Sequence, residues 1–334
     1  MLRILHDTKI DFIRLWRTTA ALTLLFIIPG LLLIAVRGYN YSVEFTGGTL
    51  MQVRFVNAPK AGDIRGALDA GGVTGAEVQQ FGGANEFVIR AQSRTDVARQ
   101  SAGADRVSQE IRSALERKFG ARSFTAVRTE AVGPKVGGEL RQKALTAVLI
   151  SFLVTLIYLA WRFEWRFGVA AVIATAHDIL ATLAFIKYAN LEISLVVVGG
   201  ILTMIGYSLN DTIIIFDRVR ENLRKKRKES LYDTLNRSVN ETLPRSVLTH
   251  ATTIATLLAL SLLAGEVIRP FALVMLFGVF TGTFSSIYVA APLLLWIETK
   301  WPREAGTAGG VGPRASVRSD APSRARSQEP VATR

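Results

Sequence analysis

The residues whose types and spacing could do chemistry are few, and the most informative ones lie inside long apolar stretches. Asp211 lies in Gly206-Tyr-Ser-Leu-Asn-Asp-Thr-Ile-Ile-Ile-Phe-Asp217, six residues before the charged edge of such a stretch. Six helical residues place its carboxyl about 9 Å inside that edge. An ionised Asp at the centre of a membrane helix costs about 2.5–3.5 kcal/mol. A carboxyl retained there is therefore a candidate for a group that takes up and releases protons as its neighbours move.

A cation that could pair with this carboxyl begins the fifth apolar stretch. Arg245 follows Pro244 there. Successive membrane helices run in opposite directions, so Arg245 and Asp211 belong to the same half of the bilayer. From spacing alone, two interpretations stand level: Arg245 forms an ion pair with Asp211, or it anchors its helix end by extending the guanidinium to the headgroups.

His177 and Asp178 form a possible secondary polar site in the third apolar stretch. Adjacent helical residues point about 100° apart, so these two side chains need not act together. A hydrogen-bonded packing role is slightly favoured for His177. A structural role is likewise favoured for His250, which lies in Thr249-His-Ala-Thr-Thr253.

The placement of these residues depends on six apolar stretches. The stretches cover 18–36, 144–161, 167–186, 193–216, 246–265 and 270–297, and they carry few ionisable groups. A spanning helix needs about 20 predominantly apolar residues. The sequence therefore predicts a polytopic α-helical membrane protein with six transmembrane helices. In the last stretch, Gly278-Val-Phe-Thr-Gly282 is a pattern that lets two helices pack closely.

The net charge of +13 over 334 residues is mainly a topology signal. With the N-terminus inside, 22 basic residues lie in the inner segments and the C-terminal tail, and only 2 lie in the short outer loops. Basic residues are enriched on the cytoplasmic side, so both termini are predicted to be cytoplasmic. The run Arg224–Lys228 is then a cluster attracted to anionic lipid headgroups, and nucleic acid is not expected as a partner.

Residues 38–142 are polar enough to form a domain outside the membrane, with 14 basic and 11 acidic residues. Strands are predicted at 50–55, 77–81, 86–91 and 124–131, helices at 62–69 and 105–119, and a hairpin turn at 82–85. This β-α-β-β-α-β order is typical of ferredoxin-like α+β domains. Gly47-Gly48 is interpreted as a tight turn, because no lysine follows at the spacing of a phosphate loop.

The predicted organisation therefore has five parts. They are a cytoplasmic N-terminus (1–17), a first transmembrane helix (18–37), the extracytoplasmic domain (38–142), helices 2 to 6 with a basic cytoplasmic loop at 217–245 (143–297), and a disordered cytoplasmic tail (298–334). The chain has no cysteine, which excludes disulfides, thiolate metal sites and a cysteine nucleophile. The external domain also lacks histidine and shows no catalytic constellation, so an enzyme is not expected.

Four stretches of the chain resemble the SecF branch of the SecD/SecF family of bacterial protein-export proteins. They are Tyr41-Ser-Val-Glu-Phe-Thr-Gly-Gly-Thr49, Val132-Gly-Pro-Lys-Val-Gly-Gly-Glu-Leu140, Ala176-His-Asp178 and the long motif that runs from Gly206 to Glu221. One departure is Glu44, where the family usually has Asp. The resemblance implies an RND-type membrane fold, a heterocomplex with SecD, and residence in the bacterial inner membrane.

The resemblance also implies a mechanism. Family members use the proton-motive force to help unfolded polypeptides cross the membrane after the ATP-driven stage, together with the SecYEG translocon and YajC. The intramembrane aspartate of the family falls on Asp211 and its arginine falls on Arg245, which favours the ion pair between them. No metal and no cofactor other than the proton gradient is implied.

Two other functions fit parts of the sequence less well. An RND-type proton-coupled exporter of lipids or small molecules would need a substrate cavity that six helices and one small domain barely provide. An intramembrane aspartyl protease using Asp178 and Asp211 would need a Gly-x-Gly-Asp setting, and Asp211 instead follows Ser208-Leu-Asn. Protein export with SecD is therefore the expected function.

Overall fold

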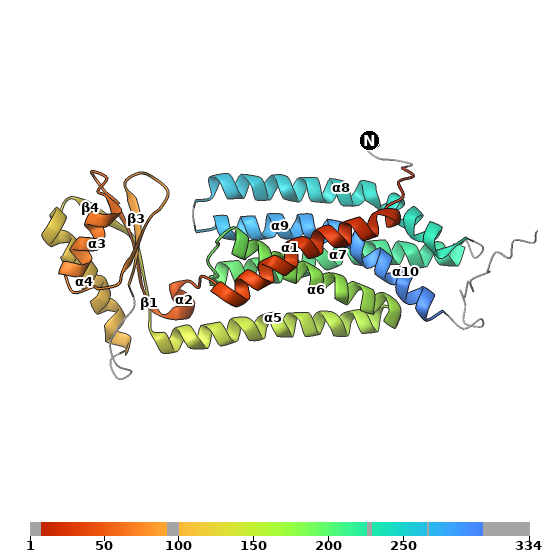
Figure 1. Ribbon diagram of the computed structural model, residues 1–334, viewed down its shortest axis with the longest axis horizontal. Helices are drawn as coiled ribbons and strands as arrows, with labels where there is room; N and C mark the ends of the chain where they lie inside the picture. The colour runs from red at the N-terminus through yellow and green to blue at the C-terminus, as the bar shows by residue number, and fades with distance from the viewer. Residues whose placement is uncertain (1–7, 92–99, 226–228, 266, 303–334) are drawn as a thin grey trace, which may run out of the picture.

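The structure is a computed structural model that describes residues 8–91, 100–225, 229–265 and 267–302. It has two parts, a bundle of long helices and a small sheet domain that extends from one end of the bundle (Figure 1). Within the described residues, six helical segments are long and apolar enough to cross a membrane. This confirms the six predicted spans. The predicted disordered tail lies mostly outside the described residues.

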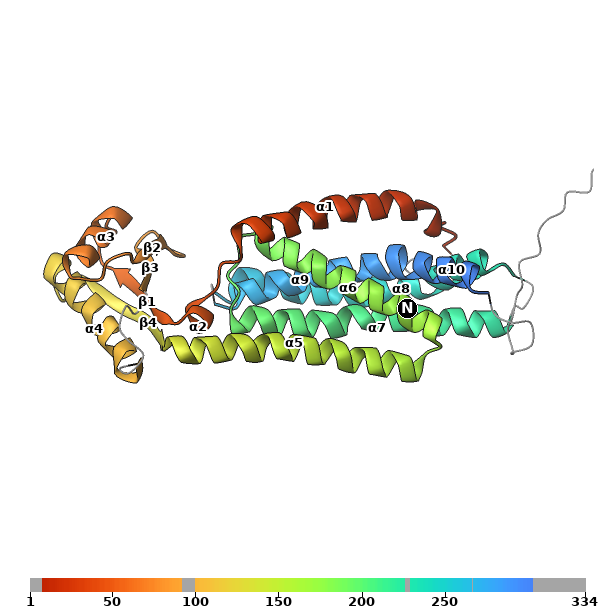
Figure 2. The ribbon, with the colours of Figure 1, turned by 60° about the horizontal axis from the view of Figure 1, so that its bottom comes forward.

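The membrane helices form a central set and a peripheral set, which differ in how much of each helix is buried. Five of them are single helices, α1 (Trp16–Arg37), α5 (Pro134–Arg162), α6 (Trp165–Tyr188), α7 (Leu195–Lys225) and α8 (Leu231–Leu263), and the sixth segment consists of α9 (Arg269–Ser285), a π-helical turn (Ser286–Ala290) and α10 (Ala291–Lys300). At least half of the apolar window is buried in α6, α7 and the sixth segment, but less than a fifth in α1, α5 and α8. Accordingly, α1 and α5 lie along opposite edges of the bundle (Figure 2).

Two helices are longer than their apolar stretches predicted. The predicted loop at 217–245 is largely helical, because α7 continues to Lys225 and α8 already begins at Leu231. Ser230 caps the start of α8 by accepting a hydrogen bond from the Asp233 amide. Amphipathic packing sustains the helices beyond the apolar stretches, since Val219 of α7 and Leu235 and Val239 of α8 are buried in one cluster. The connection from α7 to α8 lies at the end of the bundle far from the sheet domain (the inner end; Figure 1).

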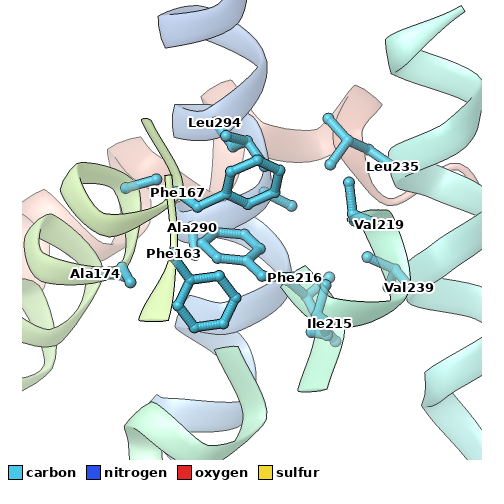
Figure 3. Close-up of a cluster of buried hydrophobic side chains, with 14 of the residues drawn as sticks. Phe163, Phe167, Ala174, Ile215, Phe216, Val219, Leu235, Val239, Ala290 and Leu294 are labelled. Atoms are coloured by element: carbon cyan, nitrogen blue, oxygen red, sulfur yellow. The ribbon is translucent and has the colours of Figure 1, made fainter. Parts of the chain in front are cut away.

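Aromatic side chains fill the inner end of the bundle. The rings of Phe167 on α6 and Phe216 on α7 meet edge to face with centroids 5.4 Å apart, and Leu294 of α10 belongs to the same cluster (Figure 3). Fully burying side chains of this size is worth about 1.5–3 kcal/mol each. This cluster therefore holds the inner halves of α6, α7, α8 and α10 together.

Glycines bring α7 and α9 into close contact. A Cβ on Gly278 would lie 2.1 Å from Cγ of Met204, and one on Gly282 would lie 2.9 Å from Cβ of Ser208. The predicted close packing at this glycine pair is therefore confirmed. Its consequence is that Ser208 and the end of α9 face each other without an intervening side chain.

The external domain has the predicted order of elements. Its strands are β1 (Gly48–Phe55), β2 (Glu77–Gln80), β3 (Glu86–Ala91) and β4 (Phe124–Val132), with helices α3 (Ala61–Ala70) and α4 (Gln100–Phe119). The sheet order is β2-β3-β1-β4 with every neighbouring pair antiparallel, as expected for a ferredoxin-like domain. Alternate residues of β1 and β3 pack on both helices, with Val53, Ile64, Ile89 and Leu115 fully buried.

A short segment joins the bundle to this domain. Gly38, Gly47 and Gly48 all have positive φ, and the last two flank the exit from helix α2 (Val43–Thr46) into β1. Such φ values favour glycine, so the predicted tight turn is confirmed. Gly137 of α5 lies so close that a Cβ there would be 2.9 Å from the Gly47 nitrogen. The chain therefore leaves and re-enters the bundle at one place.

Candidate functional site: a polar network inside the bundle

Asp211 contacts a histidine in the interior of the bundle. Its Oδ2 lies 2.9 Å from Nε2 of His250, and the two residues are only 3% and 4% exposed. Asp211 comes from α7 and His250 from α8, so the contact joins two antiparallel helices. His250, for which a structural role was favoured, is thus the direct partner of the carboxyl.

Arg245 does not occupy the place that the sequence suggested. It is exposed, and among the described residues it forms no ion pair with Asp211 or another carboxylate. The reason is the length and phase of α8: Pro244 lies inside this helix rather than at its start. Because Ser246 and His250 occupy the buried face, Arg245 points about 140° away from His250. The expected Asp211–Arg245 pair is therefore absent from this arrangement.

A third helix joins this contact through a hydroxyl group. Nδ1 of His250 lies 3.0 Å from Oγ1 of Thr283 on α9, and the same Oγ1 lies 2.8 Å from the carbonyl of Val279. The ring of Tyr207 packs near the imidazole, with centroids 5.6 Å apart. His250 is therefore held on both ring nitrogens and on one face.

Asp178 forms a second cluster that links α6, α7 and α9. Its side chain is fully buried and its Oδ2 accepts hydrogen bonds from the hydroxyls of Ser208 and Ser285, the latter at 2.6 Å. Its Oδ1 lies 3.0 Å from Nδ1 of His177. The adjacent His177 and Asp178 therefore do contact each other. Nε2 of His177 is buried and has no hydrogen-bond partner among the described residues.

The two clusters are neighbours along α7 and at the end of α9. Ser208 precedes Asp211 by one helical turn, and Thr212, next to Asp211, bonds Oγ of Ser286 at 3.0 Å. Ser286 begins the π-helical turn; such turns are rare and occur frequently at functional sites. Sequence reasoning missed these hydroxyl residues, although Ser and Thr within an apolar stretch are a usable signal for interhelical hydrogen bonds.

The first family motif reaches α7 from the outside. Oε2 of Glu44 accepts a hydrogen bond from the Leu195 amide at 2.6 Å, at the first residue of α7. A carboxylate is favourable at this position because the amide groups at a helix N-terminus lack partners and carry positive potential. The backbone of Ile193 also pairs with Asn40 and Ser42. The linker to the external domain is thus bound to the helix that carries Asp211.

Comparison with known proteins defines the family. Residues 111–300 match the family described as protein export membrane protein SecD/SecF, C-terminal, and residues 32–58 match the SecD/SecF GG motif. A protein translocase subunit SecF from Gemmatimonas aurantiaca is 62% identical over 315 residues, which cover 93% of this chain and 94% of that relative. The chain belongs to the SecD/SecF family.

Other SecF proteins and solved SecDF structures agree with this assignment. The SecF of Desulfurispirillum indicum is 41% identical, with 87% of this chain and 93% of that relative covered. A crystal structure of SecDF from Thermus thermophilus, described as a translocon-associated membrane protein, is 35% identical with a TM-score of 0.78. The match covers 90% of this chain but 40% of that one. These likenesses confirm the predicted RND-type membrane fold and a role in Sec-dependent protein translocation.

Proposed function

We propose that this SecF-family chain uses the proton-motive force to assist the late, post-ATP stage of protein export, without covalent catalysis and without a cofactor. In the proposal, Asp211 is the group that takes up and releases the proton. The observation that carries it is the buried contact between Asp211 and His250. A change in the proton occupancy of this pair alters the hydrogen bonding of three helices at once.

Arg245 enters the proposal in a second arrangement of the bundle. It precedes His250 by five residues on α8, which is about 7.5 Å along the helix axis. Arg245 reaches Asp211 only if α8 slides and rotates against α7. We propose that exchange of His250 for Arg245 as the partner of the carboxyl accompanies proton transfer.

The proton gradient is strong enough for this role. A membrane potential of 100 mV supplies about 2.3 kcal/mol for each charge that crosses. That free energy shifts a two-state equilibrium roughly fifty-fold. One or two protons would thus suffice to move the helices and, through the Glu44 contact with Leu195, the linker of the external domain.

SecD is the proposed direct partner. The apolar windows of α1, α5 and α8 are 11%, 6% and 17% buried, so these helices offer surface to lipid or to another protein. The SecDF chain of similar structure is also more than twice as long as the region it shares with this chain. We propose that SecD covers part of this surface and that SecYEG, YajC and the emerging polypeptide are further partners.

The proposed setting is the bacterial inner membrane with both chain termini in the cytoplasm. The excess of basic residues at the inner connections supports this orientation. The described basic residues beside the inner helix ends, including Arg224 and Lys225 in the last turn of α7, would bind anionic headgroups. The other residues of the predicted 224–228 cluster lie outside the described residues.

Substitution of Asp211 tests the proposal. The full chain with SecD is assayed for translocation of a precursor into inverted membrane vesicles, with and without a proton gradient. Asp211→Asn is expected to keep SecD bound but to abolish the gradient-dependent stimulation. Asp217→Asn is the matched control, because this carboxylate is 41% exposed and pairs with Arg162 at the surface. Full stimulation by Asp211→Asn would refute the proposal.

A further inference from the structure

His250 of α8 lies where α7, α8 and α9 meet, and each of its ring nitrogens has one partner. Nε2 faces Asp211 of α7 at 2.9 Å, and Nδ1 faces Thr283 of α9 at 3.0 Å. A buried imidazole needs a hydrogen-bond partner for each nitrogen, and here one of the two partners is a carboxyl, which can itself carry a proton. The hydrogen bonds of the ring therefore determine where the protons of His250 and Asp211 lie.

The hydroxyl of Thr283 has one hydrogen but two possible acceptors. It donates either to the Val279 carbonyl or to Nδ1 of His250. When it donates to the carbonyl, Nδ1 must carry a hydrogen and donate to Oγ1. When it donates to Nδ1, that nitrogen must be bare, and the hydrogen of the neutral ring is on Nε2.

These two orientations correspond to two proton counts for Asp211 and His250 together. With a bare Nδ1, the pair holds one proton, on Nε2, which donates to the ionised carboxylate. With a protonated Nδ1, the pair holds two: the second lies between Oδ2 of Asp211 and Nε2 of His250, on either atom. When the pair loses one proton, the Thr283 hydroxyl therefore rotates from the Val279 carbonyl to Nδ1 of His250, and every nitrogen of the ring keeps a hydrogen bond.

We propose that His250 is a positioning residue that shares the exchangeable proton of Asp211, with the Thr283 hydroxyl as the rotor that accommodates both states. This inference rests on the proposed function, because it assumes that Asp211 exchanges protons. It adds that the exchanging unit is the carboxyl–imidazole pair rather than the carboxyl alone. The ring holds α7, α8 and α9 together in both states.

The surroundings contain few other ionisable groups. From α7, Tyr207 packs on the ring; from α6, His177 and Asp178 lie one cluster away through Ser208. The part of α9 from 270 to 285 has no ionisable residue, and those of α10, Glu298 and Lys300, lie at its inner end. On α8 itself, Arg245 is exposed. Asp211 is therefore the ionisable group that faces Nε2.

The first test observes the ring directly. The full chain is labelled with 15N-histidine, placed with SecD in lipid nanodiscs and studied by solid-state NMR. The chain has 3 histidines, so His250→Gln identifies the signals of His250 by difference. The nitrogen shifts of His250 are expected to change with pH and to change again in Asp211→Asn. Identical His250 shifts in the wild type and Asp211→Asn over the pH range would overturn the proposal.

The second test separates proton sharing from packing. In His250→Gln, the side chain keeps an amide donor near the position of Nε2 but cannot take up a proton. A packing role would survive this change, whereas proton sharing predicts loss of most gradient-dependent export and a changed pH profile. Thr283→Val is expected to alter the pH profile, and Thr283→Ser, which restores the rotor, to return it to that of the wild type.

Thr203→Val is the matched control for the loss of a hydroxyl from the bundle. Thr203→Val removes a hydroxyl whose one hydrogen bond among the described residues is to the Gly199 carbonyl of its own helix, and it should leave export and its pH profile unchanged. If Asp211→Asn abolishes coupling but His250→Gln keeps the wild-type rate and pH profile, the inference fails and the proposed function stands. If Asp211→Asn keeps full coupling, the proposed function fails, and the NMR comparison still decides whether the proton is shared.

Discussion

At the scale of single residues, the buried carboxyl of Asp178 is hydrogen-bonded by hydroxyl groups and a histidine, and no Lys or Arg pairs with it in the part of the chain that the structure describes. Ser208 and Ser285 donate to one oxygen and His177 contacts the other. Replacing Asp178 by an apolar residue of similar volume removes the acceptor, so the buried hydroxyls of Ser208 and Ser285 lose their partner. Each unsatisfied group costs about 1–3 kcal/mol, although Ser285 can turn back to the Gly282 carbonyl.

We therefore predict that Asp178→Leu lowers the thermal unfolding midpoint of the purified complex. Asp178→Asn, which keeps one oxygen acceptor, should lower it by less than half as much. Differential scanning calorimetry in the same detergent compares the two. Equal midpoints for both variants and the wild type would mean that the cluster contributes nothing to stability.

At the scale of elements, the contact between α7 and α9 is set by Gly282. An alanine Cβ at this position would lie 3.0 Å from the Cα of Ser208, and a backbone atom cannot move aside as a side chain can. Overpacking of this kind costs about 1–3 kcal/mol. It would also move Ser208 of α7 away from Ser285 of α9, and the hydroxyls of these two residues both donate to Oδ2 of Asp178.

The prediction is that Gly282→Ala destabilises the protein and lowers gradient-dependent export, as measured by thermal unfolding and by the vesicle assay. Gly199→Ala is the comparison on α7, where a Cβ meets no atom within 4 Å. Alanine is favoured over glycine inside a helix by about 1 kcal/mol, so this variant should be neutral or slightly more stable. A destabilised Gly199→Ala with an unaffected Gly282→Ala would contradict the packing argument.

At the scale of the whole molecule, the segment before α1 packs against α8 at the inner end of the bundle, although the two are far apart in the chain. Oδ1 of Asp11 accepts hydrogen bonds from Tyr232 and Asn236 of α8 at 2.6 and 2.9 Å. The Tyr232 bond, with the Arg14 amide and Asn236, lowers the pKa of Asp11 below its ordinary value of 3.8. A lowered pKa in the folded state means that the carboxylate favours folding above pH 3.8, and that this contribution is lost as the pH falls through the lowered value.

The expected outcome is a docked N-terminal segment at neutral pH that loosens only in strong acid. Asp11→Asn should increase amide hydrogen exchange at Ile10 and Ile13, which donate to Asn240 and Asn236, at pH 7. At a pH below the lowered pKa of Asp11, where the wild-type carboxyl is also protonated, the two proteins should exchange alike after correction for the intrinsic rate. Mass spectrometry of the N-terminal peptide measures both, and equal exchange at pH 7 would exclude this docking role.

Local patterns were sufficient to predict most of this fold. The six spans follow from uninterrupted apolar stretches, and the sheet domain follows from alternation in segments such as Glu86–Ala91, because these signals depend on neighbours in sequence. The extension of α7 to Lys225 was missed because the segment after Phe216 is rich in charged residues. Its apolar residues lie on one face and pack against α8, and average hydropathy does not detect such a face.

The candidate site was only partly predictable for a related reason. Asp211 and Asp178 stand out because a carboxyl inside an apolar stretch is costly in any fold. Which cation or hydroxyl faces each of them depends on how neighbouring helices rotate about their axes. The choice of His250 over Arg245 is set by the phase of α8 against α7, and the sequence of α8 alone does not contain that angle.

The continuity of α5 has a mechanical consequence. β4 ends at Val132 and α5 begins at Pro134, so the external domain stands on the end of an unbroken rod of 29 residues, about 44 Å long. Its other attachment is the segment from Gly38 to Gly47, which is hydrogen-bonded through Ser42 and Glu44 to the start of α7. The external domain is therefore attached to two membrane helices, α5 directly and α7 through the linker. Tilting or twisting of α5 within the membrane would therefore move the external domain as a rigid body, with no change in the domain's own structure.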